Sequence, residues 1–184
     1  MIAGPDDVYT AKERERGYRR ALEARGIAPE GRLIRSGNYT IAGGAAAMRG
    51  LREMNPDMTA VFVSNYEMTV GAMMEINDLG ISVPEELSVI GFDNIDFARA
   101  SIPRLSIVTQ PTKEIAREAA GVLLERLNEG TGAKPAHEGR SAEEGAEDRM
   151  PENMPDSRDR KKGKTIKLKT RFMEGKSVKK MEQK

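Results

Sequence analysis

The fold class is decided by the stretch Val83-Pro-Glu-Glu-Leu-Ser-Val-Ile-Gly-Phe-Asp-Asn94 and its continuation Ile102-Pro-Arg-Leu-Ser-Ile-Val-Thr-Gln-Pro111. It contains two apolar runs, Leu87–Phe92 and Leu105–Val108, and both are short, rich in β-branched residues and followed at once by polar or loop-forming residues. Such runs are typical of buried strands. In an open parallel sheet, ligands bind just beyond the carboxyl ends of the strands. Asp93, directly after the first run, is therefore placed to meet a small polar molecule.

Helical and strand-like segments alternate on both sides of this stretch. Helices are predicted at Thr10–Arg25, Ile41–Met54, Glu67–Leu79 and Thr112–Leu127, with Thr10 as the N-cap of the first. Strands are predicted at Ile2-Ala-Gly-Pro, where a strand ends, and at Arg32–Arg35, Thr59–Val63 and Thr165–Met173. This β–α–β alternation predicts an α/β fold, with a parallel sheet flanked by helices.

Composition divides the chain into three regions. Residues 130–157 contain no Val, Ile, Leu, Phe, Tyr or Trp, so they bury too little apolar surface to offset the entropy of ordering. We therefore expect a folded region at 1–129, a disordered polar linker at 130–164, and a terminal strand with a basic tail at 165–184. Residues 158–184 carry 12 basic and 3 acidic side chains. A solvated tail is favoured over a nucleic-acid contact, because nothing there would read bases.

Several function classes lack the residues that they need. The chain has no cysteine, and its one histidine, His137, lies in the polar region, so neither a transition-metal site nor a Ser-His pair is expected. Gly43 and Gly44 lack the spacing of a phosphate-binding loop, and close helix packing or a loose helix start explains them better. Residues 67–83 end in a strand-like run without basic residues, which argues against a helix-turn-helix. We expect a non-enzymatic protein without a cofactor.

No membrane partner is expected either. The first residues lack the charged and apolar regions of a signal peptide, and no apolar run is long enough to span a bilayer. The expected location is the cytoplasm.

Polar and aromatic residues that suit ligand binding follow the predicted strands. Tyr39 stands in a strand-to-helix loop, Asn65 follows the strand at residues 59–63, and Arg14 lies in the first turns of the first helix. Together with Asp93 they fall on the carboxyl-end side of the predicted sheet. Each of them has surface packing or helix capping as its alternative role.

Five ordered blocks resemble one protein family. They are Arg14-x-x-Gly17-Tyr18, Gly37-Asn-Tyr39, Thr59-Ala-Val-Phe-Val-Ser-Asn65 with Gly71-Ala72, Val83–Asn94, and Pro103-x-Leu-x-x-Val-x-Gln-Pro111. In this order and spacing, across residues 2–128, they are similar to the lactose-repressor (LacI/GalR) family of bacterial transcription regulators. The resemblance implies a periplasmic-binding-protein-like core, of which this chain would contain one subdomain and part of the second. A sugar-like or nucleobase-like effector would lie between the two subdomains.

The resemblance also assigns roles to individual residues. Arg14 matches the arginine that grips the effector, Asp93 the carboxylate that accepts its hydroxyl groups, and Tyr39 the aromatic ring that stacks on it. Asn65 and Thr10 match lesser contact positions. The residue after Asn65 is usually Asp in the family and is Tyr66 here. The helix from Glu67, with Val70, Met73 and Met74, resembles the family's dimerisation helix, which implies a homodimer; an ordinary buried helix face is the alternative.

Two departures from the family pattern concern the ends of the chain. The family's helix-turn-helix domain does not precede Met1, so DNA would be bound only through that missing domain. The segment Phe172-Met-Glu-Gly-Lys-Ser-Val178 resembles the family's closing Leu-Ile-x-Arg-x-Ser, with Gly175 where the Arg belongs. The expected function is the effector-binding part of a LacI-type regulator. The alternative is a stand-alone solute-binding protein of a transport or sensing system.

Overall fold

The computed structural model describes residues 1–131 and 165–180. It divides the chain into two compact units, one of residues 1–110 with those from Thr170 onward, the other of Pro111–Lys169. The division thus falls at Gln110, inside the region 1–129 that composition had marked as one folded part. Residues 132–164, most of the expected linker, lie outside the described residues.

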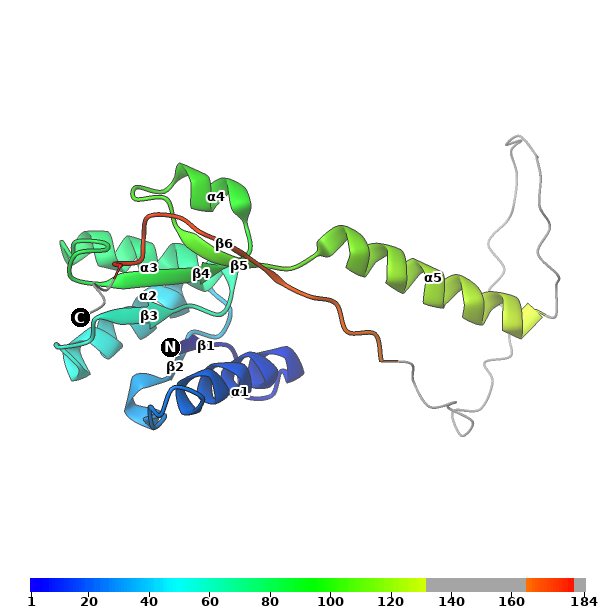
Figure 1. The fold of residues 1–184 in the computed structure, drawn as a ribbon, viewed down its shortest axis with the longest axis horizontal. Coiled ribbons are helices and arrows are strands. Elements are labelled where there is room, and N and C mark those ends of the chain that lie inside the picture. Colours follow the sequence, from blue (N-terminus) through cyan, green and yellow to red (C-terminus); the bar gives the residue numbers. More distant parts are fainter. Residues whose placement is uncertain (132–164, 181–184) are drawn as a thin grey trace. The chain divides into compact units, whose positions relative to one another are not determined.

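The first unit contains a mostly parallel sheet (Figure 1). Its strands are β1 (Ile2–Ala3), β2 (Arg35–Ser36), β3 (Ala60–Phe62), β4 (Ser88–Phe92), β5 (Ser106–Thr109) and β6 (Arg171–Met173). β1 pairs with β2, and β3 to β6 pair in sequence order. A parallel bridge between Ile2 and Val63 joins the two parts, which gives the order β2-β1-β3-β4-β5-β6. Only β6 runs antiparallel. The expected α/β fold with a parallel sheet is confirmed.

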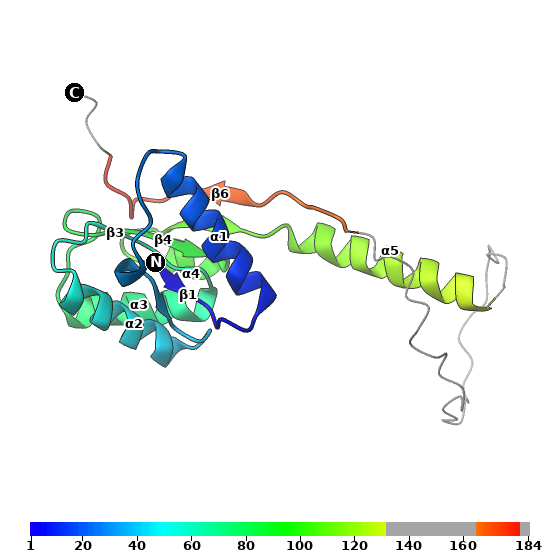
Figure 2. The same ribbon diagram turned by 90° about the horizontal axis from the view of Figure 1, so that it is seen from below.

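Helices cover both faces of this sheet, as Figure 2 shows. They are α1 (Tyr9–Glu23), α2 (Ile41–Met54), α3 (Tyr66–Asp78) and the short α4 (Ile95–Ala100). The chain moves outward from β1 to β2 but in the opposite direction from β3 onward, so right-handed connections place α1 on the face opposite α3 and α4. The reversal between β1 and β3 is a topological switch point, beyond which ligands bind in folds of this kind.

The helices α2 and α3 pack closely because glycines face the contact. A Cβ atom at Gly44 would lie 2.4 Å from the Met68 carbonyl oxygen, and one at Gly71 only 1.9 Å from that of Ile41. Around them, Met48, Leu51, Met68 and Ile76 are fully buried against the sheet. The helix-packing explanation is therefore confirmed for Gly44, whereas a Cβ atom at Gly43 would lie 2.1 Å from the Gly37 carbonyl oxygen in the preceding loop. The helix α2 begins and ends where the sequence predicts.

Three local predictions are wrong. Thr10 is not an N-cap: α1 already begins at Tyr9, and Val8 precedes it without a capping side chain. The strand at 32–35 is replaced by a 3₁₀ turn, Gly31–Leu33, followed by the two-residue β2. The strand at 165–173 shortens to Arg171–Met173, because only these residues find a partner in β5.

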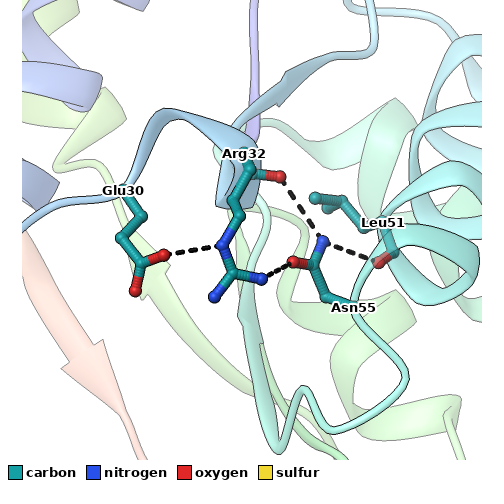
Figure 3. A network of polar contacts seen from close by, with 4 residues as sticks. All are labelled: Glu30, Arg32, Leu51 and Asn55. Atoms are coloured by element: carbon teal, nitrogen blue, oxygen red, sulfur yellow. Dashed lines mark hydrogen bonds and ion pairs between the residues drawn. The ribbon is translucent and has the colours of Figure 1, made fainter.

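A polar network explains why residues 31–33 do not continue the strand (Figure 3). The buried Asn55, at the end of α2, donates its amide to the carbonyl oxygens of Leu51 at 3.0 Å and Arg32 at 3.4 Å. The Arg32 guanidinium donates in return to the Asn55 side-chain oxygen and, at 2.6 Å, to Glu30. Because both the side chain and the carbonyl group of Arg32 are hydrogen-bonded to Asn55, the loop is held against α2.

The closing segment is tied into the first unit by Ser177, which is fully buried. Its hydroxyl accepts a hydrogen bond from the Ser106 amide at 2.8 Å and donates to the Val89 carbonyl at 2.6 Å. Its own carbonyl accepts from the Val89 amide at 2.7 Å. At Gly175 a Cβ atom would lie 2.4 Å from backbone atoms of residues 104 and 105. The backbone route found here thus leaves no space for the Arg of the family pattern.

The second unit contains α5 (Thr112–Thr131). Its apolar side chains Ile115, Leu123, Leu124 and Leu127 are 41–60% exposed. Among the residues described, no helix is long and apolar enough to cross a membrane.

Candidate functional site

The carboxyl ends of the parallel strands bring together most of the residues singled out in the sequence. Gly4 lies beyond β1, Tyr39 beyond β2, Asn65 beyond β3, Asp93 beyond β4 and Gln110 beyond β5. Because parallel strands end at the same edge, these residues share one rim of the sheet. The helix α1 starts at this rim and carries Thr10 and Arg14 in its first turns.

Arg14 is held in place by two contacts with the rim. Its guanidinium carbon lies 4.0 Å from the centre of the Phe92 ring, a cation–π geometry. One of its terminal nitrogens donates to the Ser64 carbonyl at 2.7 Å. Since a guanidinium has five N–H donors, this anchored side chain retains donors for a ligand.

Asp93 is positioned by Gln110, a residue that the sequence analysis missed. One carboxylate oxygen accepts the Gln110 backbone amide at 2.9 Å, and the other accepts its side-chain amide at 2.5 Å. Each oxygen has a second lone pair, so the carboxylate can still accept hydroxyl donors. The place of Gln110 directly after β5 was the available signal, because Asp93 stands in the same place after β4.

A groove of about 630 Å³ lies between α1 and the face of the sheet that α1 covers. It is lined by Tyr9, Thr10, Glu13, Arg14, Gly17, Tyr18 and Ala21 of α1, and by Phe62, Phe92, Val108, Gln110 and Thr170. Burial raises the pKa of Tyr18 above its usual value of 10.0, while the charge of Arg19 acts in the opposite direction. Two of the five predicted binding residues, Thr10 and Arg14, line this groove.

Tyr39 and Asn65 do not line this groove. The Tyr39 ring lies against Gly4, where a Cβ atom would be 2.3 Å from a ring carbon, and its buried hydroxyl has no hydrogen-bond partner among the described residues. The Asn65 side chain caps α3 by accepting the Met68 amide at 3.0 Å. Tyr66, at the family's usual Asp position, packs edge-to-face with Phe97, with 5.9 Å between the ring centres. These residues have structural contacts, and their ligand roles stay predictions.

The described residues contain no group of three or more His, Cys, Asp or Glu side chains that would hold a metal ion.

Comparison with known proteins identifies the family. A model described as "Periplasmic binding protein-like domain" matches residues 1–143. The chain belongs to this family. The HTH-type transcriptional repressor CytR of Escherichia coli strain K12 is 39% identical over 126 residues, which are 68% of this chain and 37% of the repressor. The chain thus spans less than half the length of this relative.

Two solved structures agree with this assignment. The structure of a transcriptional regulator, the CelR–cellobiose complex, has a TM-score of 0.73 and 31% identity, and the match covers 96% of this chain and 45% of that one. A sugar-binding regulator of the LacI family from Escherichia coli, complexed with phosphate, has a TM-score of 0.70 and 30% identity, with 96% and 53% covered. The resemblance to the LacI family is confirmed, and these relatives are transcription regulators rather than enzymes or transport proteins.

Proposed function

We propose that this chain is the effector-binding part of a LacI-type transcription regulator, and that its effector is sugar-like or nucleobase-like. The observation that carries the proposal is the pairing of an anchored donor, Arg14, with an anchored acceptor, Asp93, at the carboxyl rim of the sheet. A sugar hydroxyl both donates and accepts hydrogen bonds, so it is complementary to such a pair. The cellobiose complex of the related regulator supports the choice of ligand class.

The remaining predicted residues fit secondary roles in this proposal. Thr10 lies at the groove next to Arg14, where its hydroxyl can meet a second ligand group. The unpaired hydroxyl of Tyr39 offers a polar contact in addition to, or in place of, ring stacking. Asn65 has its side-chain oxygen engaged in capping α3, which leaves its amide group for a ligand.

The regulator is proposed to act as a cytoplasmic homodimer that binds DNA through a separate helix-turn-helix domain. The related repressor CytR is an HTH-type regulator. On α3, Met73 is buried but Met74 is 54% exposed, and Val70, Met73 and Met74 share a hollow of about 180 Å³ with Phe97 and Ile102. This partly open apolar surface supports the dimerisation role of the helix.

The test is a titration of the ¹⁵N-labelled chain with cellobiose, D-glucose, D-ribose and adenosine, followed by NMR. At least one of these ligands should shift the amide resonances of Arg14, Asp93 and Gln110. Asp93→Ala and Arg14→Ala should each weaken its binding roughly ten- to a hundredfold, because each removes a charged hydrogen-bond partner worth about 1.5–3 kcal/mol.

Two controls match these variants in charge. Asp96→Ala on α4 and Arg16→Ala on α1 remove exposed charges at positions that do not line the groove, and both should leave the affinity unchanged. Unchanged affinity in the Asp93 and Arg14 variants, or shifts confined to other parts of the chain, would show that the site is wrongly placed.

A further inference from the structure

The groove beside α1 is richer in aromatic side chains than any other part of the chain. The whole sequence contains four Tyr and four Phe, and four of these eight, Tyr9, Tyr18, Phe62 and Phe92, line it. Aromatic walls bury planar apolar groups well, through offset or edge-to-face contacts. This concentration therefore indicates a planar ligand group more than an extended polar one.

The groove is also continuous with the proposed effector site. Arg14 and Gln110 line the groove, and the same two residues meet Phe92 and Asp93 at the rim. Along α1 the lining residues recur at helical spacing, and beyond Arg14 they are Gly17, Tyr18 and Ala21. At Gly17 an added Cβ would meet nothing within 4 Å, so this side of the groove is open space.

The polarity of the lining changes along the helix. Near the rim, Thr10, Glu13 and Arg14 offer a hydroxyl group and two charges, whereas farther along α1 the only polar side-chain atom is the Tyr18 hydroxyl. The sheet side of the groove is lined by Phe62, Phe92 and Val108, with Gln110 and Thr170 as its polar residues. A second sugar ring beside Gly17, Tyr18 and Ala21 would leave hydroxyl groups without hydrogen-bond partners. An aromatic ring has no such groups, and its burial would remove apolar surface from water.

We propose that this groove is a second subsite, which holds a planar apolar substituent of an effector whose hydroxyl-bearing part meets Arg14 and Asp93. The effector would then be a glycoside with an aromatic aglycone, rather than a plain mono- or disaccharide. This inference rests on the proposed function for the sugar part of the ligand, but the groove can be tested without any sugar. Its volume of about 630 Å³ lies within the range of small-molecule pockets.

The first experiment uses benzyl alcohol as an aromatic probe without a sugar. Added to the ¹⁵N-labelled chain, it should shift the amide resonances of Gly17, Ala21 and Val108. Ala21 is exposed in the wall of the groove, so Ala21→Trp should fill the groove without burying a misfit side chain and should abolish these shifts. Ala46→Trp, at an exposed alanine of α2, is the matched control and should leave them intact.

The second experiment compares phenyl β-D-glucoside with methyl β-D-glucoside in the wild-type chain and in both tryptophan variants. The phenyl glycoside should bind at least tenfold more tightly to the wild type and to Ala46→Trp, and this preference should vanish in Ala21→Trp. If neither glycoside binds while benzyl alcohol maps to the groove, the sugar part of the proposed function fails and the aromatic subsite stands. Absence of benzyl alcohol shifts, or equal affinity for the two glycosides, overturns the subsite. It is also overturned if Ala21→Trp changes only the sedimentation of the chain, because the groove would then be a protein interface.

Discussion

Replacement of Ser177 by Ala tests how the closing segment is attached to the sheet. Ser177 is fully buried, and its hydroxyl serves two backbone groups, the Ser106 amide at 2.8 Å and the Val89 carbonyl at 2.6 Å. Alanine removes both bonds, and a single hydroxyl group leaves less space than a water molecule needs to replace it. A buried polar group left without a partner costs about 1–3 kcal/mol. For two such groups, with partial relaxation, we expect a loss of roughly 2–4 kcal/mol.

Urea denaturation followed by circular dichroism measures this loss as a shift of the midpoint at constant slope. Amide hydrogen exchange adds a local readout, since protection of the Ser106 amide should fall more than that of Ile107, its neighbour in β5. Lys176→Ala is the control, because the exposed Lys176 contributes only its backbone amide, to Arg104. A loss below about 0.5 kcal/mol, the scale of an ordinary surface substitution, would refute the reasoning.

Further substitutions probe helix packing, a buried ion pair and a partly buried tyrosine. Gly71→Ala should lower the free energy of unfolding by about 1–3 kcal/mol or more, because its Cβ would lie 1.9 Å from the Ile41 carbonyl oxygen. Gly17→Ala, where a Cβ meets nothing within 4 Å, should instead raise it by about 0.5–1 kcal/mol. Thermal unfolding of both variants measures the difference. Arg49→Met should lower the urea midpoint more than Arg16→Met does. The loss of Arg49 leaves the buried Glu75 carboxylate without its bidentate partner, whose two nitrogens lie at 2.8 and 2.9 Å. Equal midpoints in the two variants would show that this ion pair contributes nothing to stability. Since burial raises the pKa of Tyr18, the folded chain holds that proton more tightly than the unfolded one, so stability is lost as the pH rises from about 10 through the raised pKa. Tyr18→Phe should remove that part of the alkaline loss in a pH series of urea midpoints.

The alternation of strands and helices was predictable from the sequence because the signals that start and end these elements are local. The start of α2 follows from Thr40, which accepts the Gly43 amide at 2.9 Å, and that of α3 from Asn65 in the same role. The strands β4 and β5 begin one residue later than predicted. Capping side chains and β-branched runs act within a few residues, so that a single sequence is enough to read them.

The failures concern features fixed by distant residues. The turn at 31–33 depends on Asn55, 23 residues away from Arg32, and no local pattern indicates that contact. Gln110 lies 17 residues from Asp93, and its role became visible only when β4 and β5 were placed side by side. Tertiary contacts decided both of these cases. Thr10 differs: it suits an N-cap by residue type, yet α1 begins before it, at Tyr9, after a local turn in which the Val8 amide donates to the Pro5 carbonyl at 3.2 Å.

Backbone conformation provides an argument for the rim that is independent of the side chains named for it. In the parts of the chain that the structure describes, four residues other than glycine have a positive φ: Asn38, Tyr39, Asp93 and Asn94, between 48° and 57°. All four lie within three residues of the end of β2 or β4, at the carboxyl rim. Asparagine adopts this left-handed conformation at little cost, but tyrosine does so rarely. Such conformations persist where the surrounding structure enforces them, and they cluster at ligand sites. The same rim therefore combines backbone strain, the anchored Arg14 and Asp93, and the unpaired Tyr39 hydroxyl, as expected of a surface shaped for a ligand more than for stability.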